Sequence, residues 1–122
     1  MDQLHAAFAE SARQHRVPQY LLERIAERES SYRTEVINCK VVGRHGELGI
    51  MQLHPGYYSR ATACNPRKAI DTAAAILRRN FDATADWWKA VAAYNFGLPR
   101  VLAFGRVPDS VKAYADFVTK RP

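Results

Sequence analysis

Glu29 is the carboxylate in this sequence whose position most clearly suggests chemistry. It belongs to the segment LLERIAERESSY, residues 21–32, which has the apolar periodicity of an amphipathic helix. Each helical residue turns by about 100°, so Glu29, four residues after Ile25 and seven after Leu22, continues the apolar face. Glu27 falls on the opposite, charged face.

A carboxylate on an apolar face has two possible roles. It can form an ion pair or become exposed where the helix ends, which is the usual structural outcome for a single glutamate. Alternatively, a desolvated carboxyl keeps its proton at higher pH, and a proton held beside a cleft makes a general acid. Periodicity does not choose between these roles, but it identifies Glu29 as the acid to test.

The elements that must position Glu29 are mostly helices. Apolar spacing predicts a first helix over residues 2–15 and a second that opens with Pro18. The pair Asn65–Pro66 predicts the start of a helix that runs to about residue 81. We expect another helix to be capped by Thr84 and to end near Gly97. Either Asp109 or Ser110 should cap the last one.

Residues 31–49 interrupt this pattern with β-branched residues and glycines, which predicts a loop-rich segment with at most a short β-hairpin. Residues 49–63 then predict a short helical piece broken at Pro55–Gly56. The fold class that follows is mainly α, an α+β arrangement of six to seven short helices around one loop-rich segment.

Composition limits the remaining possibilities. The chain has 122 residues, 48% apolar and 25% charged, which predicts one soluble domain over residues 1–122. A net charge of +6 would attract polyanions. No apolar run is long enough to span a bilayer, and residues 1–16 are too charged for a secretory signal. Cys39 and Cys64 are either two separate buried residues or one disulfide, and both alternatives stay open.

Three motifs occur in order along the chain: ESSY at a helix end, GELGIMQLHP, and AVAAYNFG. With the lead-in VPQYLLERIAE, they resemble the soluble-lytic-transglycosylase and goose-type-lysozyme family from about residue 17 to residue 118. The resemblance implies a lysozyme-like fold in two lobes, helical and loop-rich, with a cleft between them. It also implies that Glu29 is the catalytic acid and that peptidoglycan glycan strands are the substrate.

The same resemblance implies the residues that contact sugar: Met51 and Gln52 in the Gly-Ile-Met-Gln turn, His54 after it, and the pair Tyr94 and Asn95. Isoleucine replaces the usual leucine of the turn. His54 stands where many transglycosylases have a methionine, and Ser110 where they often have a glutamate. Each of these motif residues also has a purely structural interpretation: the glycines as turn residues, Met51 as a core residue, and Tyr94 and Asn95 as a helix end.

Glycoside hydrolysis usually needs two carboxylates, and the only other acid near the turn is Glu47, which we expect to be exposed. The resemblance therefore favours a lytic transglycosylase, which cleaves the MurNAc-β-1,4-GlcNAc bond with Glu29 alone and leaves 1,6-anhydromuramyl ends. The alternatives are a hydrolytic muramidase and a non-catalytic glycan-binding module. A nucleic-acid binder ranks last, because the basic residues form no stripe along one helix.

The expected partners are peptidoglycan and, through the positive charge, anionic envelope polymers. We expect no cofactor, because the mechanism needs none. No metal is expected either, since the four histidines show no ligand spacing. Nor do we expect nucleic-acid binding or stable membrane insertion, and the protein should be a monomer.

Lacking a signal, it should stay in the cytoplasm until a phage holin releases it or a virion delivers it to the periplasm or cell wall. A secretion-system accessory enzyme is the other possibility.

Overall fold

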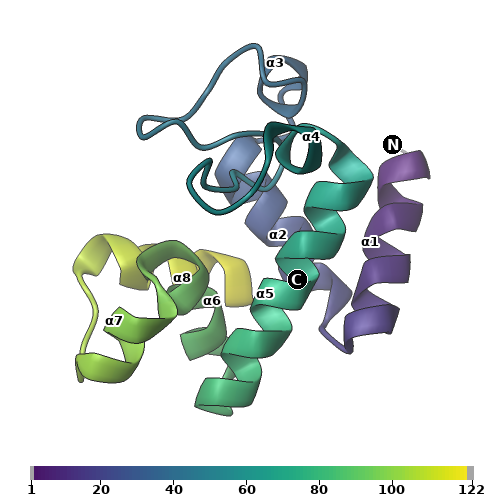
Figure 1. The fold of residues 1–122 in the computed structure, drawn as a ribbon. Helices are drawn as coiled ribbons and strands as arrows, with labels where there is room; N and C mark the ends of the chain where they lie inside the picture. Colours follow the sequence, from purple (N-terminus) through teal and green to yellow (C-terminus); the bar gives the residue numbers. More distant parts are fainter. Residues whose placement is uncertain (1, 121–122) are drawn as a thin grey trace. The chain divides into compact units, whose positions relative to one another are not determined.

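The computed structural model describes residues 2–120, which contain eight helices (Figure 1). These are α1 (Asp2–His15), α2 (Gln19–Ser30), α3 (Thr34–Ile37), α4 (Arg60–Ala63), α5 (Pro66–Thr84), α6 (Trp87–Phe96), α7 (Leu98–Ala103) and α8 (Asp109–Thr119). The mainly α fold class is confirmed, with eight helices where six to seven were expected. None of the helices in this part of the chain is long and apolar enough to cross a membrane.

The chain divides into two compact units, Met1–Ala74 and Ala75–Pro122. The division falls inside α5, so the first unit contains α1 to α4 and the start of α5, and the second contains the rest. Each unit has its own buried side chains.

In the first unit, α1 and α2 pack against each other. The bounds of α1 agree with the prediction, whereas α2 begins at Gln19, so that Pro18 is its N-cap residue instead of lying in its first turn. Asn65 caps α5 as expected, because its side-chain oxygen accepts a hydrogen bond from the Lys68 N–H at 3.1 Å. The most deeply buried side chains of this unit are Phe8, Leu21, Leu22, Ile25, Ile50, Met51 and Ile70.

The segment between α2 and α5 is loop-rich, as predicted, but it forms no hairpin. Its one β feature among the described residues is an isolated antiparallel bridge between Leu48 and Leu53. The short helical piece predicted over residues 49–63 is confirmed only after its break, where α4 lies; before the break residues 49–52 form a turn and Leu53 the bridge, so that part of the prediction is wrong. A disulfide joins Cys39, after α3, to Cys64, after α4, and decides the open question about the cysteines.

In the second unit, α6 packs against both α7 and α8. Asp86 caps α6, because its carboxylate accepts a hydrogen bond from the Lys89 N–H at 2.9 Å. The prediction that Thr84 is this cap is wrong: Thr84 ends α5, and its hydroxyl donates to the Asn80 carbonyl. Gly97 ends α6 as expected. Pro108, not Asp109 or Ser110, is the N-cap residue of α8.

Candidate functional site

Glu29 lies in the last turn of α2 and is half-buried, whereas Glu27 and Arg28 beside it are exposed. The residues one and two turns before it on the same face, Ile25 and Leu22, are fully buried. The prediction that Glu29 continues the apolar face is therefore confirmed. An acid in this position is reachable from solvent and at the same time borders the apolar interior.

The chain leaves α2 immediately after Glu29 through a tight turn. Ser31 and Tyr32 both adopt left-handed backbone angles, with φ of 52° and 55°. Ser30 is buried, its hydroxyl donates to the Ala26 carbonyl at 2.9 Å, and the same oxygen accepts the Tyr32 N–H at 3.2 Å. The Ser30 side chain thus fixes the helix end that carries Glu29.

Tyr32 anchors this turn from the other side. Its hydroxyl donates to the Glu23 carbonyl at 2.7 Å, and its ring meets the edge of Phe8 at a centroid distance of 6.4 Å. Burial, reinforced by the nearby charges of Glu23 and Glu27, raises the pKa of Tyr32 well above its ordinary value. In the sequence, Ser30 and Tyr32 are recognised only as parts of the ESSY motif. The sequence signal for their role in positioning Glu29 is that a serine and an aromatic residue follow the candidate acid closely.

The Gly-Ile-Met-Gln turn is held closed by two backbone hydrogen bonds between Leu48 and Leu53, each of 3.0 Å. Ile50 and Met51 point inward and are fully buried. Met51 is therefore part of the packed interior, and its predicted contact with sugar stays a prediction. The turn is anchored by its apolar side chains, and Gln52 remains half-buried at its end.

Gln52 is held by its own turn. Its backbone has a left-handed φ of 50°, and its side-chain Nε2 donates to the Gly49 carbonyl at 3.0 Å. A β-carbon on Gly43 would lie 2.5 Å from Gln52 Oε1 and 2.6 Å from Glu47 Oε1, so the loop before the turn passes close to both side chains. Glu47 is half-buried, not exposed as expected, and its carboxylate accepts the His45 N–H at 2.8 Å.

The turn also contacts the end of α4. Gly49 has a φ of 81°, and a β-carbon on it would overlap the carbonyl oxygen of Ala63. Cys64, the next residue, is disulfide-bonded to Cys39, and Arg60 donates to the Cys39 carbonyl at 3.5 Å. The disulfide therefore ties the segment after α2 to the helix against which the Gly-Ile-Met-Gln turn packs.

His54 is exposed directly after the turn. Its Nδ1 accepts the Gly56 N–H at 2.9 Å, and its ring lies 5.3 Å from that of Tyr57, which is 82% exposed. Because Nδ1 is occupied by the backbone, only the other ring nitrogen and the ring faces are available for a ligand.

Tyr94 and Asn95 lie in the last turn of α6, in the second unit, where Tyr94 is half-buried and Asn95 is exposed. Glu29, Met51, Gln52 and His54 all belong to the first unit. The predicted site residues are thus divided between the two units, and the first unit contributes the candidate acid.

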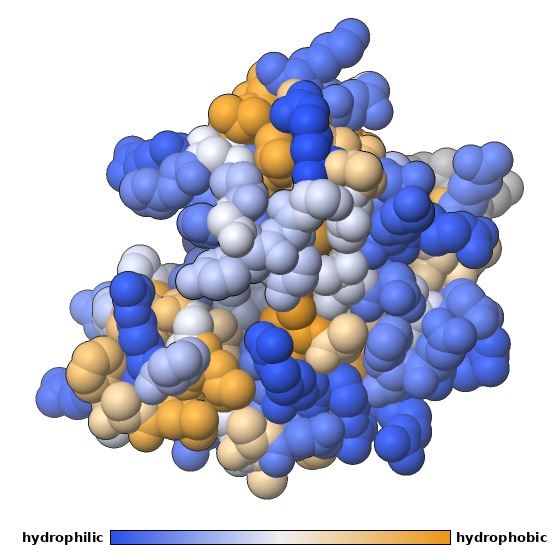
Figure 2. Space-filling view, viewed as in Figure 1, coloured by the Kyte–Doolittle hydropathy of each residue, from blue (hydrophilic) through white to orange (hydrophobic). Residues whose placement is uncertain are grey.

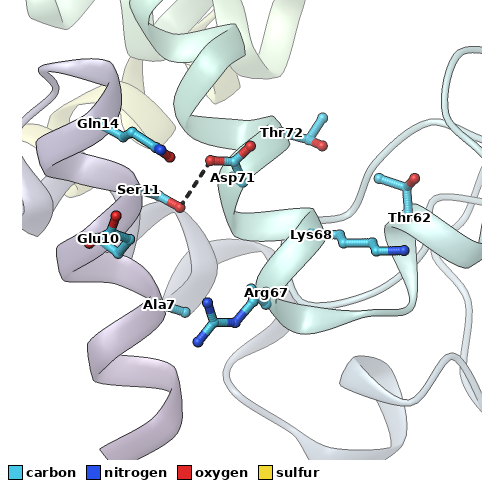
Figure 3. A pocket seen from close by; sticks show the side chains of 9 residues that line it. All are labelled: Ala7, Glu10, Ser11, Gln14, Thr62, Arg67, Lys68, Asp71 and Thr72. Carbon is cyan, nitrogen blue, oxygen red and sulfur yellow. Dashed lines mark hydrogen bonds between the residues drawn. The ribbon is translucent and has the colours of Figure 1, made fainter.

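A separate polar pocket of about 410 Å³ lies between α1 and α5 in the first unit (Figure 3). Asp71 reaches from α5 toward α1, where it accepts hydrogen bonds from Ser11 at 3.4 Å and His15 at 2.9 Å. None of the predicted site residues lines this pocket, and its hydrogen bonds join the two helices. Over residues 2–120 no group of three or more His, Cys, Asp or Glu side chains could hold a metal ion.

The fold and the motifs together define a mainly helical domain with a half-buried glutamate in the last turn of its second helix and, later in the chain, a Gly-Ile-Met-Gln turn closed by two backbone hydrogen bonds. Comparison with protein families matches residues 6–116 to the transglycosylase SLT domain. The chain therefore belongs to this family. Membership supports lytic-transglycosylase activity on peptidoglycan in general and implies that peptidoglycan is bound. No match was found among curated proteins or among solved structures.

Proposed function

We propose that the protein is a lytic transglycosylase that cleaves the MurNAc-β-1,4-GlcNAc bond with Glu29 as its single catalytic carboxylate. The observation that carries this proposal is the half-buried position of Glu29 on the apolar face of α2, at a helix end fixed by Ser30. A general acid must be held at a fixed place beside the substrate, and a half-buried carboxyl at this helix end meets that requirement.

In the proposed reaction, the Glu29 carboxyl donates its proton to the glycosidic oxygen as the bond between this oxygen and the anomeric carbon breaks. The oxocarbenium-like centre is then attacked by the muramyl 6-hydroxyl oxygen. Glu29, now a carboxylate, takes the proton of that hydroxyl, which closes the 1,6-anhydro ring and restores the acid. Bonds and protons balance without water.

The position of Glu47 favours this route over hydrolysis. A hydrolytic muramidase needs a second carboxylate to attack the sugar or to activate water. Glu47 is the acid closest in sequence to the turn, and its carboxylate accepts a backbone hydrogen bond from His45 that shapes the loop. We assign it a structural role. Gln52, His54, Tyr94 and Asn95 are proposed to contact the glycan, and Met51 to support the turn from within.

The disulfide between Cys39 and Cys64 supports an oxidising place of action. We propose that the protein works in the bacterial periplasm or cell wall, where its substrate is found.

The test is mass spectrometry of muropeptides released from purified sacculi by the wild-type protein, by Glu29→Gln and by Glu27→Gln. Wild type should release products lighter by one water than reducing muropeptides. Glu29→Gln should reduce release by about 10²–10⁴-fold. Glu27→Gln, an exposed residue on the same helix, should behave like wild type.

Other outcomes would change the assignment. Reducing ends that disappear in Glu47→Gln would identify a hydrolytic muramidase. Binding to sacculi without release of products by any variant would identify a glycan-binding module.

A further inference from the structure

The second unit carries an apolar surface that the proposed cleavage does not use. Leu102, at the end of α7, is 58% exposed and Phe104, just after it, is 55% exposed. They border a pocket of about 590 Å³ whose other apolar side chains include Trp88, Val101 and Val107. We call these five residues the α7 patch. Figure 2 shows apolar side chains gathering at the lower left, where Figure 1 places α7.

Three cationic side chains line the pocket that the α7 patch borders. Lys89, Arg106 and Lys112 line the same pocket, against one carboxylate, that of Asp109. Lys112 pairs with Asp116 at 2.8 Å, but within residues 2–120 neither Lys89 nor Arg106 forms an ion pair. Two cations therefore remain available to an anionic ligand at the rim of an apolar pocket.

Trp88 gives the pocket an oriented aromatic side chain. Its indole Nε1 donates to Asp116 Oδ1 at 2.8 Å, so its polar atom is satisfied and its position is fixed. Next to Phe104, a β-carbon on Gly105 would meet no atom within 4 Å, which leaves open space around the tip of this segment. Among the described residues of the second unit, the Phe96 ring lies 6.2 Å from that of Phe104, yet Leu102 and Phe104 both stay more than half exposed.

We propose that the α7 patch binds the surface of an anionic membrane. Apolar side chains interspersed with Lys and Arg are the features with which proteins bind the boundary between headgroups and acyl chains. Leu102, Phe104 and Arg106 stand within one short segment, so they can meet a planar surface together. The pocket beneath them has room for part of an acyl chain, and Lys89 and Arg106 meet the phosphate groups.

Charge favours a membrane over a second copy of the chain. Each molecule carries a net charge of +6, so two patches rimmed by cations would repel each other. An anionic bilayer offers the opposite charge, which attracts each cation near its surface. The binding is peripheral and independent of glycan cleavage.

The experiment is co-sedimentation with vesicles of equimolar phosphatidylglycerol and phosphatidylcholine, compared with vesicles of phosphatidylcholine alone. The wild-type protein should bind the anionic vesicles, and high salt should weaken the binding. The double variants Leu102→Ser/Phe104→Ser and Lys89→Gln/Arg106→Gln should each reduce binding roughly tenfold or more. All four side chains are exposed, so we expect these variants to fold.

Val42→Ser/Arg44→Gln is the matched control, because Val42 is 52% exposed, Arg44 is exposed and both belong to the first unit. This control should bind vesicles like wild type. In a Trp87→Phe background Trp88 is the only tryptophan, and its emission should shift to shorter wavelength when anionic vesicles are added.

Equal binding to neutral vesicles, no binding, or unchanged binding by both patch variants would overturn the proposal. A dimer in sedimentation equilibrium that Leu102→Ser/Phe104→Ser dissociates would also overturn it, by showing that a second copy covers the patch. Digestion of sacculi, which contain no bilayer, should be the same for the patch variants and wild type. Failure of this proposal is thereby distinguished from failure of the proposed cleavage.

Discussion

Gly49 and the carbonyl oxygen of Ala63 are in such close contact that any side chain on Gly49 would overlap the oxygen. This contact joins the Gly-Ile-Met-Gln turn to the end of α4, one residue before the disulfide at Cys64. The position of Gln52 at the end of the turn therefore depends on a glycine three residues earlier.

Gly49→Ala should lower the free energy of unfolding by about 2–4 kcal/mol, because a β-carbon both clashes with backbone and disfavours the positive φ of 81°. Thermal or urea unfolding measures this loss. Gly46→Ala is the matched control: its φ is 87°, but the nearest atom would be Pro55 Cγ at 3.4 Å, so the loss should be about 1 kcal/mol. Equal losses would show that the contact with Ala63 is unimportant.

Ser30→Ala should reduce turnover on sacculi more than its loss of stability explains. The change removes the hydroxyl that accepts the Tyr32 N–H and donates to Ala26, and we expect it to cost about 1–2 kcal/mol in stability. Because the helix end that holds Glu29 then loosens, the rate of product release should fall while binding to sacculi is kept. Ser31→Ala, an exposed neighbour, should leave the rate unchanged.

The free energy of unfolding should fall in alkaline solution because of Tyr32. Its pKa is raised in the folded protein, so above pH of about 10 the unfolded chain loses the proton while the folded protein keeps it. The contribution of Tyr32 to stability is complete below the pKa that Tyr32 has in the unfolded chain. This contribution is lost as the pH rises toward the higher pKa that Tyr32 has in the folded protein. Urea unfolding between neutral pH and pH of about 11 should therefore show a steeper decline for wild type than for Tyr32→Phe. Parallel declines would contradict this role.

Removal of the disulfide should destabilise the protein. The bond spans a sequence separation of 25 residues, for which loop-closure entropy predicts roughly 3.5 kcal/mol. Cys39→Ser/Cys64→Ser should unfold at correspondingly lower urea concentration, and a reducing agent should bring wild type to the same value. The reducing agent should have no effect on the double variant, which separates loss of the bond from other effects of the reagent.

Asp86→Ala should lower the free energy of unfolding by about 1 kcal/mol, since it removes the oxygen that caps α6. Far-ultraviolet circular dichroism during thermal unfolding checks this value. The control is Asp82→Ala, which removes an exposed carboxylate paired only with Arg78 on the same helix and should cost less. A larger loss for Asp82→Ala would contradict the assignment of the cap.

Local signals in the sequence were sufficient for features that depend on nearest neighbours along the chain. The bounds of α1, the start of α5 at Asn65–Pro66 and the end of α6 at Gly97 follow from periodicity and capping, which act within a turn or two. The same periodicity placed Glu29 on the apolar face, because the turn per residue is fixed by the helix itself.

Features that depend on distant residues were decided only by the tertiary structure. Thr84 and Asp86 are both residue types that cap helices well. In the structure α5 continues through Thr84, so Asp86 is the residue whose side chain accepts the Lys89 N–H and caps α6. Periodicity also gives no information about contacts between separate segments. Such contacts are the disulfide between Cys39 and Cys64, the approach of Gly49 to Ala63 and the packing of Met51 into the interior. Sequence alone thus determined the bounds of α1, the start of α5, the end of α6 and the helix face that carries the candidate acid. Packing decided which side chains hold them in place, because long-range contacts form only when the chain is folded.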